Sequence, residues 1–430
     1  MTWIRLGWKN VWARPVQAML TAAVVALAVA LGVSVYLVAD ASRRAMQQAA
    51  LPFDVVVGDR GSAMQLAFNA VFLQDVPIGN VPYELYARLR EDPRVAWALP
   101  LALGDNYRGF RVVGTTAEAF ERLRRDGTPD GPPLLSVQEG RTFGAPFEAV
   151  VGADVARALG IRVGDTFQAA HGVTAAIEPE VHADVYHVVG VLAWSGHPYD
   201  RGIFVDIRSV WEVHHEHGAG EQGGAGHGAP GAPGAEPPAS AASAPEPPGD
   251  VTIVLVRPTN LMAAYQIYQE LNNGDVAQAV FPGQVLGQIF QLLGTGQEVL
   301  SGVALSTIVM AGITVLLSLS WATLARERDV AVLRAVGAHR LAILAVTLVE
   351  SLVITLLGAA AGVGAGYGVA ALLARSVRAQ TAIAASLGWH PGAGWMALAA
   401  VGIGLLASLW PALATYRRSA GEVLARAMGN

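Results

Sequence analysis

Histidines are the residues in this chain whose type and spacing could do chemistry. Eight of the ten histidines lie between residues 171 and 227. Four of these stand beside glutamates in a segment without hydrophobic periodicity: His214, His215, His217 and His227. Neutral imidazoles on a flexible chain bind Zn²⁺, Ni²⁺ or Cu²⁺. The spacing predicts weak, adaptable zinc binding by these four residues, and the competing interpretation is a solvated polar loop.

Other chemistries find little support in the sequence. A P-loop needs a lysine in the pattern G-x-x-x-x-G-K-[S/T], whereas the only lysine, Lys9, stands in the unrelated context GWKN. Cysteine is absent, so the chain has no disulfide framework and no thiolate nucleophile. No Ser-His-Asp order or paired carboxylates stand out, so we predict no catalytic residue. The net charge of −5 does not indicate a nucleic-acid partner.

The chain also contains long apolar runs. The chain is 53% hydrophobic and 15% charged, which is more apolar than an ordinary soluble domain. A helix needs about 20 apolar residues to cross a bilayer, and four runs are long enough: 16–39, 298–324, 341–373 and 394–416. The first run exceeds the roughly 7–15 residues of a secretory signal core, so we predict four transmembrane helices.

Positive charges beside these runs predict the orientation of the chain. Most of them fall on one side: Arg5, Lys9, Arg14, Arg326, Arg328, Arg334, Arg340, Arg417, Arg418 and Arg426. Only Arg43, Arg44, Arg375 and Arg378 lie close on the other side. By the positive-inside rule, the leading segment 1–15, the segment 325–340 and the tail 417–430 are cytoplasmic. Residues 40–297 and the loop 374–393 are then exported.

The exported residues 40–297 alternate short apolar strands with helices and turns, which predicts an α+β domain. Strands are expected at 53–58, 93–101, 110–114, 149–152, 185–192, 202–207 and 251–256, and helices at 83–90, 154–159 and 261–271. Residues 214–249 are rich in Gly, Ala, Pro and Ser, so we predict a disordered insertion within one loop of this domain. Helical spacing at 285–293 predicts a stalk above the second span.

Between the second and third runs lies a short charged segment that predicts an amphipathic helix beside the membrane. Its apolar residues recur at helical spacing, and a glycine that tolerates positive φ follows the last of them. The residues concerned are Arg326, Glu327, Arg328, Val330, Leu333, Arg334, Val336 and Gly337. The run RERDVAVLRAVGA resembles the loop between the second and third membrane helices of FtsX-like permeases, the family of macrolide-export and lipoprotein-release transporters.

Three further stretches resemble the same family. IRLGWKNVWARP is similar to its basic, aromatic leading helix, here within residues 1–15. EAVVGADVARALGIRVGD, followed by YHVVGVL and DRGIFVD, resembles its periplasmic core domain. WPALATYRRSAGEVL resembles its closing motif, although Ser419-Ala420-Gly421 replaces the usual Asp-Pro. The resemblance implies an α-helical membrane protein with four transmembrane helices and a large periplasmic α+β domain inserted between helices 1 and 2.

The resemblance also implies a function. The chain would be the membrane subunit of an ABC transporter in the bacterial inner membrane, with two copies of a separate cytoplasmic ATPase that binds ATP and Mg²⁺. The charged segment would contact that ATPase, and a second copy of the chain or a homologous permease would complete a dimer among membrane lipids. Cargo could be lipoprotein, lipid, peptide or drug, passed to a periplasmic or outer-membrane partner. The alternatives are a non-transporting protein that activates a periplasmic partner such as a cell-wall hydrolase, and metal-linked export through the His-rich loop.

Small residues and one carboxylate distinguish the third apolar run. Gly358, Gly362 and Gly366 recur every four residues and leave a smooth helix face for close packing. Packing within one protomer and packing across a dimer are both consistent with this spacing. Glu350 lies within the same run, where a charge is costly without a partner. We expect either a structural ion pair with an arginine or a proton relay.

Overall fold

The computed structural model describes residues 8–9, 11–172, 181–221, 249–324, 339–381 and 388–417. The chain divides into two compact units. The helical unit comprises Met1–Arg44, Gln291–Val377 and Ala385–Asn430, and the sheet unit comprises Ala45–Phe290 and Arg378–Ala384. In chain order, the sheet unit is therefore an insertion between the first and second long helices.

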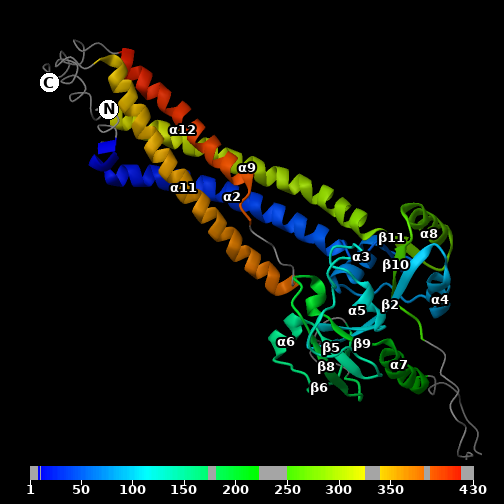
Figure 1. Cartoon of the computed structure of the whole chain (residues 1–430). Coiled ribbons are helices and arrows are strands. Elements are labelled where there is room, and N and C mark those ends of the chain that lie inside the picture. Colours follow the sequence, from blue (N-terminus) through cyan, green and yellow to red (C-terminus); the bar gives the residue numbers. More distant parts are fainter. Residues whose placement is uncertain are drawn as a thin grey trace, which may run out of the picture. The chain divides into compact units, whose positions relative to one another are not determined.

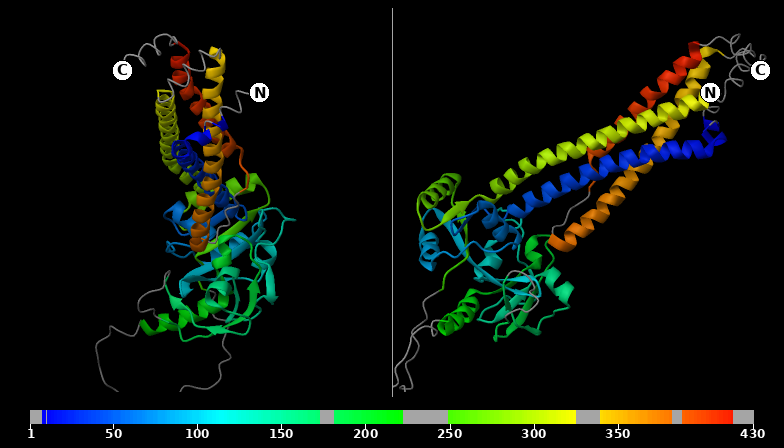
Figure 2. Two further views of the ribbon diagram at one scale, coloured as in Figure 1. Left: turned by 90° about the vertical axis from the view of Figure 1, so that its left-hand side faces the viewer. Right: turned by 180° about the vertical axis from the view of Figure 1, so that it is seen from behind.

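Four long helices lie wholly or partly in the helical unit (Figures 1 and 2): α2 (Pro15–Ala50), α9 (Pro282–Leu324), α11 (Arg340–Thr381) and α12 (Pro391–Arg417). Each is long and apolar enough to cross a membrane. The four spans predicted from sequence fall within them. Large apolar side chains on these helices are exposed, among them Leu27, Trp321, Trp395 and Trp410. Contiguous apolar surface of this kind fits a lipid environment rather than water.

The core of the helical unit is built from residues that recur at helical spacing. On α2 these are Val25, Val29, Val33 and Leu37, four residues apart. The other helices contribute Ile308, Ala311, Val315, Leu319, Ala359, Ala370, Ala393 and Ala400. Most of the residues from α11 and α12 are alanines, which permit a close approach of neighbouring backbones.

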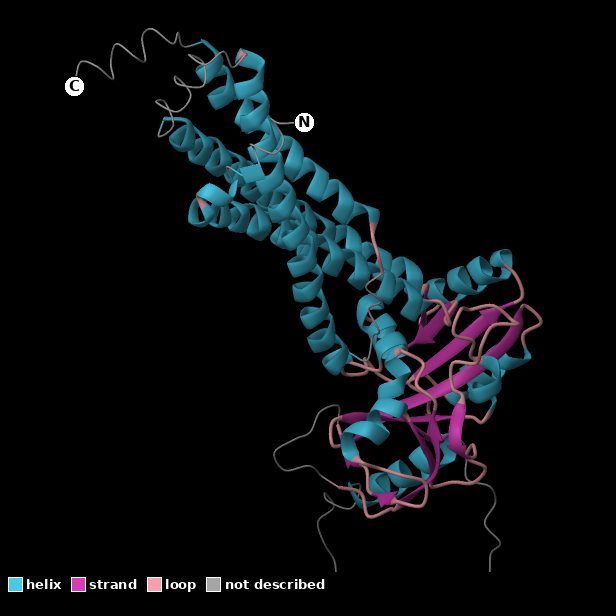
Figure 3. Ribbon diagram, turned by 60° about the vertical axis from the view of Figure 1, so that its left-hand side comes forward, coloured by secondary structure: helices cyan, strands magenta, loops and turns pink. Residues whose placement is uncertain are grey.

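The sheet unit contains an 11-stranded sheet with the order β11-β1-β10-β2-β3-β9-β5-β8-β4, in which β6 also pairs with β8 and β7 with β2. Figure 3 shows these strands together. Their bounds are β1 Val55–Gly58, β2 Val95–Tyr107, β3 Phe110–Thr115, β4 Val137–Gly140, β5 Glu148–Val151, β6 Thr166–Phe167, β7 Ala170–His171, β8 Tyr186–Leu192, β9 Ile203–Asp206, β10 Ile253–Pro258 and β11 Gln278–Val280. Among the strands that the structure describes, the pairs β3/β9 and β5/β8 are parallel and the other pairs are antiparallel.

Two apolar layers form on the sheet unit because side chains alternate along each strand. On β1, Val55 and Val57 enter one core cluster, whereas Val56 enters the other. The first cluster includes residues of α4 (Tyr83–Glu91), α6 (Ala153–Leu159), α7 (Ile207–Glu221) and α8 (Leu261–Asn273). The second includes residues of α3 (Ala63–Phe72) and α5 (Glu118–Arg122). A short 3₁₀ helix, Pro198–Arg201, precedes β9. Because both faces are covered, the strands read as nearly continuous apolar runs.

Several elements extend further than the sequence indicated. The strand expected at 93–101 continues to Tyr107, because the second half of β2 pairs with β3 and β7. The loop expected at 374–393 is partly helical: α11 runs to Thr381 through a segment without glycine or proline, and α12 begins at Pro391, a residue suited to the first helical position.

The first residues of the insertion expected at 214–249 are helical, because helix α7 continues to Glu221. The preceding turn of α7 buries Val210 and Val213, and Trp211 Nε1 donates a hydrogen bond of 3.0 Å to the Asp250 carbonyl. These contacts hold the first half of the helix, from which the polar residues 214–221 continue. Residues 222–248 and most of the leading segment 1–15 lie outside the described residues.

Candidate functional site

The glycines predicted as a packing face on α11 lie against α2 of the same chain. A Cβ added at Gly358 would stand 2.7 Å from the carbonyl oxygen of Ala22, and one added at Gly362 would stand 2.6 Å from that of Ala26. At Gly366 the nearest atom would be Val33 Cβ, at 2.8 Å. The absence of side chains at these positions is what allows the two backbones to approach. The structure thus brings the three glycines together on one intrachain interface.

Two further glycines of α11 have different surroundings. A Cβ added at Gly364 or Gly368 would meet nothing within 4 Å. These residues therefore provide a matched comparison, because they lie on the same helix at the same four-residue spacing. Only the positions that contact α2 require a glycine for steric reasons.

Hydrogen bonds between helices supplement this packing. Gln17 Nε2 donates to the Ser318 carbonyl at 2.8 Å, and the hydroxyls of Thr21 and Ser318 lie 2.8 Å apart. Ser351 Oγ donates to the Gly404 carbonyl at 3.1 Å. Such bonds link α2 to α9 and α11 to α12, in a region where lipid offers no alternative partner. Glu350, with 7% of its surface exposed, lies buried on α11, as an ion pair and a proton relay both require.

A polar cluster occurs where α2 carries its two arginines. Arg43 and Arg44 lie 3.3 and 2.8 Å from the carboxylate of Asp40. The same carboxylate lies 3.5 Å from His390 Nε2, and His390 Nδ1 lies 3.2 Å from the hydroxyl of Tyr36. His390 directly precedes α12, so the cluster ties the start of that helix to α2.

The eight residues predicted to contact an ATPase lie outside the described residues: Arg326, Glu327, Arg328, Val330, Leu333, Arg334, Val336 and Gly337. The described helices bracket them, since α9 ends at Leu324 and α11 begins at Arg340. Their role therefore stays a prediction from sequence.

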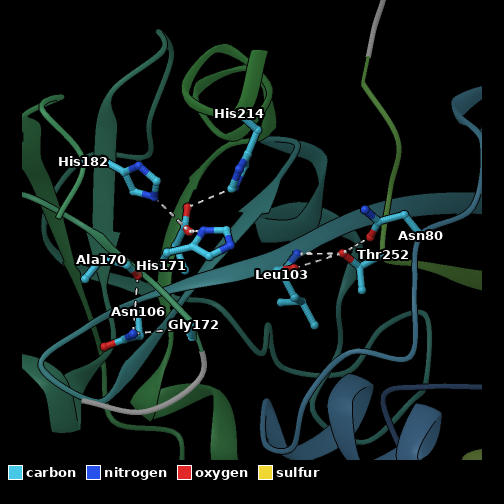
Figure 4. Close-up of polar contacts among 10 residues, drawn as sticks. Asn80, Leu103, Asn106, Ala170, His171, Gly172, His182, His214 and Thr252 are labelled. Atoms are coloured by element: carbon cyan, nitrogen blue, oxygen red, sulfur yellow. Dashed lines mark hydrogen bonds and ion pairs between the residues drawn. The ribbon is translucent and has the colours of Figure 1, made fainter. Parts of the chain in front are cut away.

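Of the four histidines predicted to bind zinc, the structure places the side chain of one. His214 lies on α7 beside Asp105 of β2, His171 of β7 and His182, which precedes β8 (Figure 4). His215 and His217 belong to α7 as well, and His227 lies outside the described residues. The partners of His214 thus come from distant parts of the chain rather than from its neighbours in sequence.

A single carboxylate stands at the centre of these imidazoles. Asp105 Oδ1 lies 3.3 Å from His171 Nδ1 and 3.2 Å from His182 Nε2, while Oδ2 lies 3.5 Å from His214 Nε2. The three ring centroids form a triangle with sides of 5.3 to 5.8 Å. Sequence reasoning missed Asp105, His171 and His182 as a group.

Burial and hydrogen bonding act in opposite directions on Asp105. Its side chain is 2% exposed, and burial alone raises the pKa of a carboxyl group. The imidazoles of His182 and His214 outweigh this effect, so the pKa of Asp105 lies below its ordinary value. The carboxylate is therefore ionised at neutral pH.

Four apolar helices long enough to cross a membrane, with an α+β sheet unit inserted between the first two in chain order, define the class as a membrane protein with a large folded domain. Two family models match the chain, the FtsX-like permease C-terminal domain over residues 301–420 and the MacB-like periplasmic core domain over residues 18–266. The second match alone covers more than half of the chain, so the chain belongs to the FtsX-like ABC permease family. The resemblance stated from its sequence motifs is thereby confirmed. No curated protein matches the chain.

Proposed function

We propose that this permease subunit couples ATP hydrolysis by a separate cytoplasmic ATPase to movement of its sheet unit, and so moves a cargo such as lipoprotein, lipid, peptide or drug. The observation that supports this most strongly is the length of two helices. Helix α2 has 36 residues and α9 has 43, whereas about 20 suffice to cross a bilayer. Neither has a proline inside it, and proline is a common cause of sharp helix kinks.

The ATPase would engage the segment between α9 and α11. In this proposal Leu333 and Val336 are apolar anchors in a groove of the ATPase, and Arg326, Arg328 and Arg334 make contacts at the rim. Buried anchors carry most of the free energy of such interfaces, and rim charges carry little. The chain itself is non-catalytic in this scheme, and ATP with Mg²⁺ binds to two copies of the partner. A second copy of the chain, or a homologous permease, completes the complex in the inner membrane.

The experiment compares an anchor with a rim residue. Leu333→Asp should abolish stimulation of the ATPase in reconstituted membranes, because it places a charge in an apolar contact. Arg334→Ala should reduce stimulation only modestly. Membrane insertion of both variants is checked by carbonate extraction. Normal stimulation by correctly inserted Leu333→Asp would show that the docking assignment is wrong.

A non-transporting signalling role is the alternative, and the size of the sheet unit, Ala45–Phe290, favours transport over it. The two differ in what accompanies ATP hydrolysis. A transporter should release bound cargo from the membrane in step with hydrolysis, as mass spectrometry of co-purified molecules before and after ATP addition would detect. Hydrolysis with unchanged bound material would favour signalling.

A further inference from the structure

We propose that Asp105, His171 and His214 form a binding site for Zn²⁺ in the sheet unit, with His182 holding Asp105 in position. The site goes beyond the permease function and does not depend on it. It also differs from the flexible-loop hypothesis drawn from sequence, because two of its three ligands lie on paired strands: Asp105 of β2 is the register partner of His171 of β7.

The spacing of the ligand atoms fits a zinc ion. One ligand atom from each of Asp105, His171 and His214 lies within 4.8 Å of the others. A tetrahedral ion that binds at about 2.0–2.1 Å places its ligand atoms about 3.3 Å apart. His171 Nδ1 stands 3.3 Å from Oδ1 and His214 Nε2 stands 3.5 Å from Oδ2 of Asp105. Each imidazole nitrogen is therefore already near the spacing that an ion shared with this carboxylate requires.

The surroundings of Asp105 suit a bound cation. Within the described part of the chain, the buried oxygen Asp105 Oδ2 makes only a long contact of 3.5 Å with His214 Nε2 and no hydrogen bond of ordinary geometry, and a poorly satisfied buried acceptor is destabilising. Arg111 is a buried cation on β3, but it donates to the Asp75 carbonyl instead. Three imidazoles around one carboxylate give a donor set that binds borderline divalent ions, whereas Mg²⁺ and Ca²⁺ prefer oxygen ligands.

His182 is placed to orient the ligand Asp105 without binding the ion itself. It is 3% exposed, and its Nε2 lies 3.2 Å from the Asp105 Oδ1 atom. In protein metal sites, a hydrogen bond to a ligand carboxylate fixes its orientation, and loss of that bond typically weakens metal binding about 10–100-fold. Its contact with Oδ1 leaves Oδ2 available to the ion.

Access to the site comes from a cavity of about 430 Å³ that His171 and His214 both line. Trp211, Asn80 and Thr252 also border this cavity, and Thr252 bonds to Asn80 and Leu103 beside it (Figure 4). His171 and His214 are 57% and 37% exposed. A zinc site with three protein ligands keeps a position for water or another ligand. We therefore expect an exchangeable ion, with that position directed to the cavity.

The test measures Zn²⁺ binding by calorimetry to the full chain in detergent after removal of metal with EDTA. We expect one tight ion per chain. His171→Ala should weaken its affinity at least 100-fold, and Asp105→Asn should do the same. His171 is the safer variant, because its exposed side chain contributes little to folding. Co²⁺, used as a spectroscopic probe, should give visible absorption in the parent that His171→Ala removes.

Two controls distinguish this site from the loop. His187→Ala removes an exposed histidine of β8 and should leave affinity unchanged. The triple variant His215→Ala, His217→Ala, His227→Ala should also retain the tight ion. Unchanged affinity in His171→Ala and Asp105→Asn would overturn the proposal, as would loss of the ion in the triple variant, which would assign it to the loop. A thermal melt in EDTA verifies that each variant is folded, and neither outcome bears on ATPase coupling.

Discussion

Adding methyl groups to α11 should destabilise the helical unit only where the helix contacts α2. Two double variants make the comparison: Gly358→Ala with Gly362→Ala, and Gly364→Ala with Gly368→Ala. Both add two methyl groups to one helix at the same spacing. The gain of about 1 kcal/mol that alanine brings over glycine in a helix interior is therefore common to both.

The magnitude follows from the contacts of the added atoms. At Gly358 the new Cβ would lie 2.7 Å from the Ala22 carbonyl oxygen, and at Gly362 it would lie 2.6 Å from that of Ala26, whereas ordinary contact begins at 3.4 Å. Because these neighbours are backbone atoms, α2 itself must move. Overpacking of this kind costs about 1–3 kcal/mol per site. The two double variants should differ by about 2–6 kcal/mol if the sites contribute separately.

Thermal unfolding of the purified chain in detergent, followed by tryptophan fluorescence, measures the difference. The Gly358/Gly362 variant should melt well below the parent, and the Gly364/Gly368 variant at or above it. Size-exclusion chromatography shows whether each remains monodisperse. Equal melting temperatures for the two variants would refute the intrachain packing argument.

Three other predictions use the same chain. Cysteines introduced singly at Ser136 and Gly337, in a protein that has none of its own, should react with an impermeant thiol reagent from opposite sides of the membrane; labelling from one side would contradict the four-span topology. Burial lowers the pKa of His197 from 6.5 to about 4. As the pH falls through this interval, the unfolded chain binds the proton before the folded chain does. The free energy of unfolding should therefore fall by up to about 3 kcal/mol. Denaturant unfolding at pH 7 and pH 4 should show this loss, and His197→Gln should reduce it. Ser318→Ala removes the hydroxyl that contacts Thr21 Oγ1 and Gln17 Nε2, although the bond from Gln17 to the Ser318 carbonyl remains, and it should lower stability by about 0.6–1.7 kcal/mol. Ser306→Ala, which removes an exposed hydroxyl bonded within its own helix, should have little effect in the same melt.

The strands and helices of the sheet unit could be predicted because local signals agree with the fold. Short apolar runs mark β1, β8 and β9, and a glycine in the left-handed region at Gly160, with φ 71°, ends α6 where the sequence indicates a stop. Helix α7 is different. Its second half is polar and rich in histidine, and its inner face is stabilised by tertiary contacts that composition does not report.

For both the glycine face of α11 and the histidine cluster, one segment of sequence does not identify the distant segment that it contacts. The spacing of Gly358, Gly362 and Gly366 predicts that a helix approaches, but the identity of that helix depends on Ala22 and Ala26, which recur on α2 at the matching interval. That matching stripe was available in the sequence. The meeting of Asp105 with His171 depends on strand register instead, and register is set by the assembled sheet rather than by either segment alone.

The pairing of β1 with β11 determines how the sheet unit would respond to mechanical load. Helix α2 ends at Ala50, shortly before β1, and α9 begins at Pro282, directly after β11. The strands are antiparallel, with Val56 opposite Val280, so both tethers attach at the same end of one strand pair. If α2 and α9 moved together, the strand pair would move as a rigid body. Tethers that diverge would peel the pair apart one hydrogen bond at a time, which takes less force than shearing it. Under the proposed coupling, a common movement of α2 and α9 would leave this strand pair intact, whereas their separation would load the β1/β11 hydrogen bonds first.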